Sequence, residues 1–231
     1  KRVGIIGTGA TSVQVVPEIA KVVKELYVFQ RTPSSIDVRD QRATKQEEIE
    51  EWKKEPGWAL ARRERLATIS SGRTALQGND DFLSGKVDAI KKKKKHLKPI
   101  SPEELIQKQL NSNFRIMEQI RARVEEVVED PKTAAALKPY YPYGCKRPTF
   151  HDEFLSAFNL PHVHLVDTAP DGVKKINEGG IVHDGAQYDL DVLIYATGFQ
   201  WMGTGSFNMI VGEGGQTLRD KWGGEGVKTF L

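Results

Sequence analysis

The distribution of apolar residues at the start of the chain predicts a strand, a turn and a helix. The run at residues 3–6 is mostly apolar, as in parallel strands that are covered on both faces. Apolar positions then recur at helical spacing between residues 11 and 24. A second apolar strand, at residues 26–29, follows where a βαβ unit would place it. The opening pattern therefore predicts the start of a parallel sheet.

The middle of the chain has a different composition. Residues 44–137 are rich in Glu, Lys, Arg, Gln and Ala, with scattered large apolar residues. Ser101 before Pro102 is typical of a helix start. Asp130 before Pro131 stops one helix or starts the next. Glycine-containing breaks at 56–57, 72 and 78–79 divide the region into separate helices.

Strand patterns return in the last third of the chain. We expect further buried strands at 163–166 and 189–195, and an antiparallel pair at 173–176 and 180–183. The predicted fold class is α/β, a Rossmann-like NAD(P)-binding domain with a long helical insertion. The expected parts are the first half of that domain at 1–43, the insertion at 44–138 and the second half at 139–199.

Two glycines separate the first strand from the first helix. Gly7 permits a tight turn, and Gly9 lets backbone N–H groups approach a pyrophosphate. The following helix directs the positive end of its dipole at the same place. Ser12 stands where Gly or Ala is usual, and serine is small enough for close helix–strand packing. The pattern predicts a dinucleotide site.

The end of the second strand indicates which dinucleotide. In a site for NAD, an Asp or Glu there accepts a hydrogen bond from the ribose 2′-hydroxyl. Here the place holds Gln30, Arg31 and Thr32. A guanidinium can bind a 2′-phosphate through two charged hydrogen bonds, whereas a carboxylate would repel it. The sequence therefore favours NADPH over NADH as the cofactor. The alternative interpretation is that Arg31 is an arginine of a solvated loop.

A pair of cations forms the second unusual feature. Lys146 and Arg147 lie between Gly144 and Pro148, and the proline biases Arg147 toward an extended backbone. Adjacent cations with a restricted backbone suit a phosphate, a developing oxyanion, or one of each. An exposed basic loop is the alternative interpretation.

Size and composition allow one large domain or two small ones. The chain has 231 residues, 39% hydrophobic and 28% charged, with a net charge of +3 that is too small to indicate a nucleic-acid partner. The lysine run at 91–95 is interpreted as a solvated helical face. No apolar run approaches the roughly 20 residues of a membrane span, so we expect no membrane partner. With Cys145 as the only cysteine and no secretory leader, we expect a cytoplasmic setting.

Histidines are sparse and suggest no metal site. His162 and His164 lie two residues apart without an evident third ligand, so we expect a pair on a strand surface. His151 and Asp152 are expected to cap a helix that begins near Glu153.

With these motifs in place, the chain resembles the type I Baeyer–Villiger monooxygenases, flavoproteins that insert oxygen into ketones. The resemblance rests on residues 7–14, 29–33, 144–148, 195–199 and 222–231, in the order that the family shows. Residues 31–37 look most like members that act on large cyclic or polycyclic ketones. The resemblance implies the cofactors NADPH and FAD, and a ketone and O2 as substrates.

The resemblance also implies residue roles. The pyrophosphate would be cradled by Gly7, Thr8, Gly9, Ala10, Thr11, Ser12, Val13 and Gln14. The 2′-phosphate would be held by Arg31, Thr32 and Lys146. Arg147 would be the catalytic arginine, close to the cofactors, where it stabilises a C4a-peroxyflavin and the adduct with the ketone. The crossing back to the FAD domain would be marked by Ala196, Thr197 and Gly198, with residues 200–231 returning to that domain.

The family's FAD motif and its Phe-x-Gly-x-x-x-His fingerprint would lie before Lys1. We therefore expect this chain to be the NADPH-binding portion of a longer polypeptide, inactive by itself, with the FAD domain as its partner. Three alternatives stay open. An N-oxygenating flavin monooxygenase would lack the pattern at 146–148. A disulfide reductase would need a second cysteine besides Cys145. A non-catalytic module would bind NADPH without supporting oxygen consumption.

Overall fold

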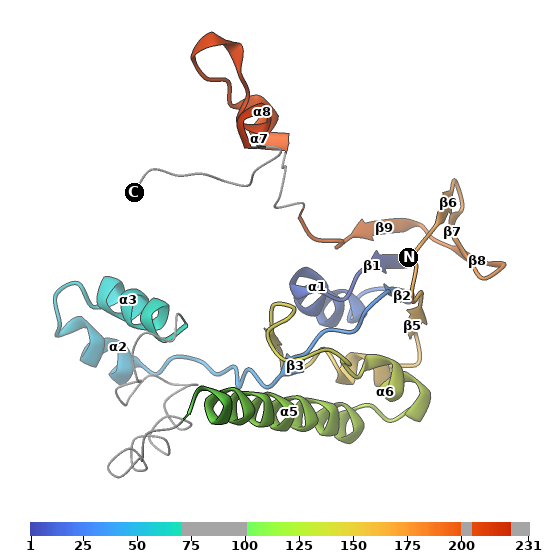
Figure 1. The fold of residues 1–231 in the computed structure, drawn as a ribbon. Helices are drawn as coiled ribbons and strands as arrows, with labels where there is room; N and C mark the ends of the chain where they lie inside the picture. The colour runs from blue at the N-terminus through green and yellow to red at the C-terminus, as the bar shows by residue number, and fades with distance from the viewer. Residues whose placement is uncertain (71–100, 200–204, 223–231) are drawn as a thin grey trace.

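The computed structural model describes residues 1–70, 101–199 and 205–222, and its centre is a parallel sheet (Figure 1). The sheet has four strands in the order β5-β2-β1-β9, and every neighbouring pair is parallel. Its strands are β1 (Arg2–Ile6), β2 (Glu25–Gln30), β5 (Val163–Asp167) and β9 (Val192–Tyr195). This sheet confirms the predicted α/β fold class.

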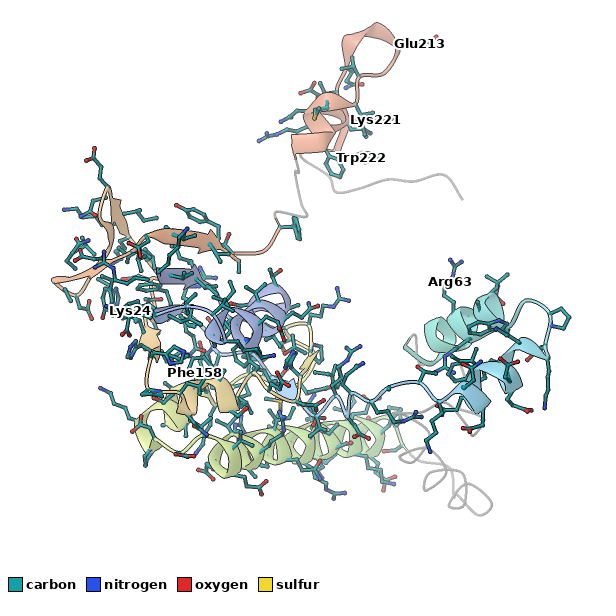
Figure 2. The ribbon with its side chains drawn as sticks, turned by 180° about the vertical axis from the view of Figure 1, so that it is seen from behind. Lys24, Arg63, Phe158, Glu213, Lys221 and Trp222 are labelled. Carbon is teal, nitrogen blue, oxygen red and sulfur yellow. The ribbon has the colours of Figure 1, made fainter. Side chains whose placement is uncertain are left out.

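The hydrophobic core lies between the sheet and helix α1 (Ala10–Ala20). Ile5 and Val28 lie opposite each other in β1 and β2, and both are fully buried. Val13 and Val16 pack against them from the helix. The same core takes in the 3₁₀-helix η2 (Ser156–Asn159), where Phe158, labelled in Figure 2, packs edge-on against Phe154 at 5.3 Å between ring centroids.

Helix α1 ends earlier than predicted. The sequence pattern suggests a helix to residue 24, but the helix ends at Ala20. The Lys24 N–H donates to the Lys1 carbonyl at 2.9 Å, so the chain lies beside β1 one residue before β2 begins. The apolar residues at 22 and 23 therefore lie in the connection.

A small antiparallel sheet precedes β9. The predicted pair is present as β6 (Lys175–Asn177) and β7 (Gly180–His183), and a third strand, β8 (Ala186–Asp189), was not predicted. The predicted buried strand over 189–195 is confirmed only over 192–195, as β9, whose residues are exposed or half-buried rather than buried. Asp189 ends β8, and Asp191 instead accepts a hydrogen bond from the backbone N–H of Arg2 at 2.6 Å.

Four helices are described within the predicted insertion. They are α2 (Gln46–Lys53), α3 (Trp58–Ser70), α5 (Pro102–Val127) and α6 (Pro131–Leu137). Ser101 caps α5 through the Glu104 N–H, as predicted, and α6 starts at Pro131, where the Asp130 side chain caps it through the Thr133 N–H. The break at 56–57 separates α2 from α3. The breaks at 72 and 78–79 and the lysine run lie outside the described residues.

The second part of this region is built into the central core. Val124 of α5 and Leu137 of α6 are buried in the same apolar cluster as the strands. In Figure 1, α5 runs beside the segment of β3 (Ile36–Asp37), which pairs in parallel with β4 (Thr149–Phe150). This pairing was not predicted, and it joins the chain that follows β2 to the chain that follows Arg147.

The C-terminal segment contains three short elements. They are α7 (Gly205–Met209), η3 (Glu213–Gly215) and α8 (Leu218–Trp222), shown in red in Figure 1. The ring of Phe207 packs edge-on against Trp222 at 5.4 Å between centroids. None of the helices described in the structure is both long and apolar enough to cross a bilayer.

Candidate nucleotide site at the carboxyl ends of the strands

The predicted site residues gather where the parallel strands end. Gly7 follows β1, Arg31 follows β2 and Ala196 follows β9. The chain proceeds from β1 to β2 and β5 on one side of the sheet, whereas β9 adds to the other side of β1. In open α/β sheets, ligands bind in the crevice at such a change of direction.

Gly7 is required by the geometry of the turn. Its φ of 106° lies in the region that favours glycine. A Cβ on this residue would lie 2.5 Å from the Ala196 carbonyl oxygen, closer than any real contact. The Gly7 N–H donates to the Phe29 carbonyl at 2.8 Å. The turn is therefore fixed between β2 and β9.

Gly9 faces open space. It is the N-cap of α1 with φ of −79°, and a Cβ placed on it would meet no atom within 4 Å. No side chain caps this helix, and its first turn contains no acidic residue. Because the first N–H groups of a helix lack internal partners, this end offers donors and a positive dipole to an anion. The residues present fit a pyrophosphate.

The other motif residues divide into two groups. The Thr8 side chain is buried and donates to the Thr32 carbonyl at 3.1 Å, which ties the glycine turn to the end of β2. The side chains of Ser12 and Val13 lie on the buried side of α1. These two residues can therefore contact a nucleotide only through backbone groups. The exposed members are Ala10, Thr11 and Gln14, and the Gln14 amide donates to the Ala10 carbonyl at 2.8 Å.

The side chains of the three residues at the end of β2, Gln30, Arg31 and Thr32, differ in exposure. Gln30 is buried and its amide donates to the Ala136 carbonyl on α6 at 2.8 Å, so this side chain is not available to a ribose. Arg31 is exposed, and its methylene groups lie over Gly172 in the turn that follows β5. Arg31 and Thr32 thus remain as the candidates at this strand end.

Lys146 lies near Arg31, although they are far apart in sequence. Partial desolvation and the nearby Arg31 guanidinium lower the pKa of Lys146 below its usual value. Its ammonium also lies 5.4 Å from the centre of the Tyr141 ring. Within the part of the chain that the structure describes, neither cation forms an ion pair with a carboxylate. Two neighbouring cations without an acid suit an anion of more than one negative charge.

Arg147 is exposed and follows Lys146 directly. The residues after it, Pro148 and Thr149, line one side of a cleft of about 560 Å³, and Ala10 and Gln14 of α1 line the other. The residues that directly follow the two cations therefore share this cleft with the first turns of α1.

The third cluster follows β9. The Ala196 N–H donates to the Ile6 carbonyl at 2.9 Å, and its side chain is buried beside the glycine turn. Thr197 is exposed, and Gly198 has a φ of 89° with open space at its Cβ position. The structure thus brings Gly7 beside Ala196, Thr8 beside Thr32, and Arg31 near Lys146.

Some residues of this region were not identified from the sequence. The Ser35 N–H donates to the Tyr141 hydroxyl at 3.0 Å, and Thr149 donates to the Ser35 carbonyl through its own N–H at 3.0 Å. The Ser35–Tyr141 contact joins residues that are 106 positions apart. No local pattern could have indicated it.

The predicted role of Asp152 is wrong. Its carboxylate accepts backbone N–H groups from residues 39–41 at 2.9–3.0 Å, instead of capping a helix near Glu153. These N–H groups lower the pKa of Asp152, and the charge of Arg123 adds to this. His151 does accept the Glu153 N–H through Nδ1 at 3.1 Å.

The prediction of a histidine pair on a strand surface is wrong, because His162 lies in the turn before β5 and only His164 is on the strand, and the two have separate partners. His162 Nε2 contacts the Ala20 carbonyl at 2.8 Å, and His164 Nε2 contacts Glu25 at 2.7 Å. Over residues 1–70, 101–199 and 205–222, no group of three or more His, Cys, Asp or Glu could hold a metal ion.

The sheet, the open glycine turn and the paired cations together define a nucleotide-binding domain of the Rossmann type. No protein-family model matches the chain. Among curated proteins, the chain is 43% identical over 249 residues to Baeyer-Villiger monooxygenase ATR8 of Stachybotrys chlorohalonatus, covering 100% of this chain and 37% of that protein. It is 42% identical to polycyclic ketone monooxygenase of Thermothelomyces thermophilus, covering 100% of this chain and 38% of that protein.

Solved structures give the same result. The polycyclic ketone monooxygenase from Thermothelomyces thermophila matches with a TM-score of 0.76 and 40% identity, covering 99% of this chain and 39% of that one. The predicted resemblance to Baeyer–Villiger monooxygenases is therefore confirmed. The chain spans about two fifths of the length of the curated relatives that it matches.

Proposed function

We propose that the chain is the NADPH-binding portion of a flavin-dependent monooxygenase that inserts one oxygen atom of O2 into a ketone, giving an ester or a lactone. The observation that carries this proposal is the open, uncapped start of α1, whose glycine turn is bonded through Thr8 to Thr32, directly after the exposed Arg31. Lys146 adds a second cation, whose pKa the charge of Arg31 lowers. The names of the relatives support the reaction class. The name polycyclic ketone monooxygenase supports a bulky cyclic ketone as the substrate.

The proposed site has two parts. The backbone of residues 7–14 holds the pyrophosphate at the start of α1. Arg31, Thr32 and Lys146 hold the 2′-phosphate. In this arrangement residues 1–43 and 139–199 form the NADPH domain, 44–138 are inserted, and the chain from Ala196 onward leads toward a FAD domain.

Bound NADPH and FAD supply the hydride and the activation of oxygen. The chain's own residues position the nucleotide and provide a fixed charge. The guanidinium of Arg147 supplies a cation that stabilises negative charge developing on the ketone oxygen. The Gly7 turn places the pyrophosphate, and the open side of α1 leaves room for it.

The test is Arg31→Ala in the full-length protein, with Arg63→Ala as a control on the exposed surface of α3. We expect the KM for NADPH to rise about 10- to 150-fold, because one charged contact is worth roughly 1.5–3 kcal/mol. The KM for NADH should stay within about twofold, since NADH lacks the phosphate.

A product assay with a ketone and an amine completes this experiment. Ester formation with NADPH supports the proposal. Equal effects of Arg31→Ala on both nucleotides would overturn the site, and oxygenation of the amine alone would establish the N-oxygenating alternative.

A further inference from the structure

The backbone just before the two cations is held by a side chain of the helical insertion. Asn113 on α5 donates from Nδ2 to the Tyr143 carbonyl at 2.9 Å and accepts the Tyr143 N–H on Oδ1 at 2.8 Å. One amide thus satisfies both backbone groups of one residue, three positions before Lys146. Asn113 is half-buried, so these bonds are partly shielded from water.

The same helix holds the backbone on the far side of the cations. Arg123 donates from Nη2 to the His151 carbonyl and from Nη1 to the Ile36 carbonyl, each at 3.0 Å. Burial lowers the pKa of Arg123 from its ordinary value. Arg123 follows Asn113 by ten residues, so about 15 Å of helix separates them. The two side chains bracket the segment that carries Lys146 and Arg147.

Beyond Pro148 the segment is held by β4, whose Thr149 donates to the Ser35 carbonyl, whereas residues 144–147 have few other constraints. Gly144 has a φ of 92°, and a Cβ there would meet nothing within 4 Å. The Cys145 N–H closes a turn onto the Pro142 carbonyl at 3.1 Å. Residues 144–147 are all exposed. The position of the cations therefore depends on the bonds at either end of the segment.

We infer that Asn113 is a positioning residue, which sets the place of Lys146 and Arg147 from helix α5 and so links the helical insertion to recognition of the NADPH phosphate. This inference rests on the proposed function. Without the amide, the Tyr143 N–H and carbonyl lose their partners and must turn toward water. The Gly144 turn then moves, and Lys146 leaves its place near Arg31.

The test compares Asn113→Ala with Asn111→Ala in the full-length protein. Asn111 lies on the same helix, is exposed, and bonds to Gln107 at 2.9 Å on the helix surface. Alanine is the best helix former, so neither change weakens α5 itself. We expect Asn113→Ala to raise the KM for NADPH about 5- to 20-fold, because the phosphate contact is weakened rather than removed.

Two further readouts separate positioning from general damage. The KM for NADH should change less than about twofold in Asn113→Ala, whereas a damaged domain would lose both nucleotides. The amount of ester formed per NADPH oxidised should fall, because Arg147 moves with Lys146. Asn113→Asp keeps the acceptor for the Tyr143 N–H but loses the donor, so it should show the same NADPH-specific loss.

The outcomes are distinguishable. If the unaltered protein does not prefer NADPH, the proposed function fails. If it prefers NADPH but Asn113→Ala and Asn113→Asp both behave like Asn111→Ala, the positioning role is overturned while the proposed function stands.

Discussion

Gly7 and Ala196 approach each other so closely that a single carbon on Gly7 would lie 2.5 Å from the Ala196 carbonyl oxygen. This contact joins the turn after β1 to the end of β9, the two strands between which the sheet changes direction. The glycine turn after β1 and the segment that follows β9 are therefore one structural unit.

Gly7→Ala should destabilise the fold by at least about 2 kcal/mol. A positive φ costs alanine roughly 1–2 kcal/mol, and displacement of the Ala196 backbone adds to this. Chemical denaturation of the full-length protein measures the effect. The matched control is Gly9→Ala, whose Cβ would enter open space. It should cost about 1 kcal/mol or less, because alanine is a poorer N-cap than glycine but meets no atom here. It should nevertheless weaken NADPH binding, so equal losses of stability in the two variants would contradict this account of the turn.

The elements that the sequence predicts correctly are those specified by local pattern. The strand at 2–6, the turn at Gly7 and the helix boundaries at Ser101 and Asp130 each depend on residues close together in the chain. Their apolar spacing and capping side chains are visible without the fold. The strand over 186–189 was missed because three of its four residues are exposed and it has no apolar run.

Long-range contacts could not be predicted. The β3–β4 pairing involves only Ile36, Asp37, Thr149 and Phe150, too few residues for any alternation to be recognised. Asn113 has no motif around it, and its bond to Tyr143 spans 30 positions. The pairing of Arg31 with Lys146 was expected only from the family resemblance. The structure places them near each other, and their role in binding phosphate stays a prediction.

Binding of NADPH should depend on the protonation of Lys146. The pKa of this lysine is lowered by desolvation and by Arg31, so it loses its proton at a lower pH than an ordinary lysine. Below that pKa the site has both charges, and as pH rises through it the affinity for NADPH should fall. Fluorescence titration of the full-length protein at several pH values measures this.

NADH is the control for the same titration. Its affinity should stay flat, because it has no 2′-phosphate. In Arg31→Ala the decline in NADPH affinity should move to higher pH, since one cause of the lowered pKa is removed. A parallel decline for both nucleotides would show that the alkaline effect arises elsewhere.

Asp152 should contribute stability that depends on acid pH. Its pKa is lowered by the N–H groups of residues 39–41, so its contribution is present above the unfolded value of 3.8 and is lost as pH falls through the lower folded value. Asp152→Asn should cost about 1 kcal/mol at neutral pH and flatten the pH dependence. The exposed Glu178→Gln serves as a control and should change neither property. Identical acid profiles for Asp152→Asn and the unaltered protein would refute this.

The last prediction concerns Arg147. Because a fixed charge at a developing oxyanion is typically worth about 10²- to 10³-fold in rate, Arg147→Ala should reduce ester formation by at least that factor. Flavin reduction by NADPH should persist, since the proposed phosphate contacts of Arg31 and Lys146 are unchanged. Stopped-flow reduction and product analysis of the full-length protein measure the two steps separately.

Arg147→Lys tests whether the permanence of the charge matters. Lysine restores a cation but can lose its proton, whereas arginine cannot at accessible pH. We therefore expect Arg147→Lys to form some ester, in an amount that declines at alkaline pH. In the unaltered protein, ester formation should decline only as far as the affinity for NADPH does. Undiminished oxygenation by Arg147→Ala would remove this residue from the chemistry and leave the basic segment with phosphate recognition through Lys146 alone.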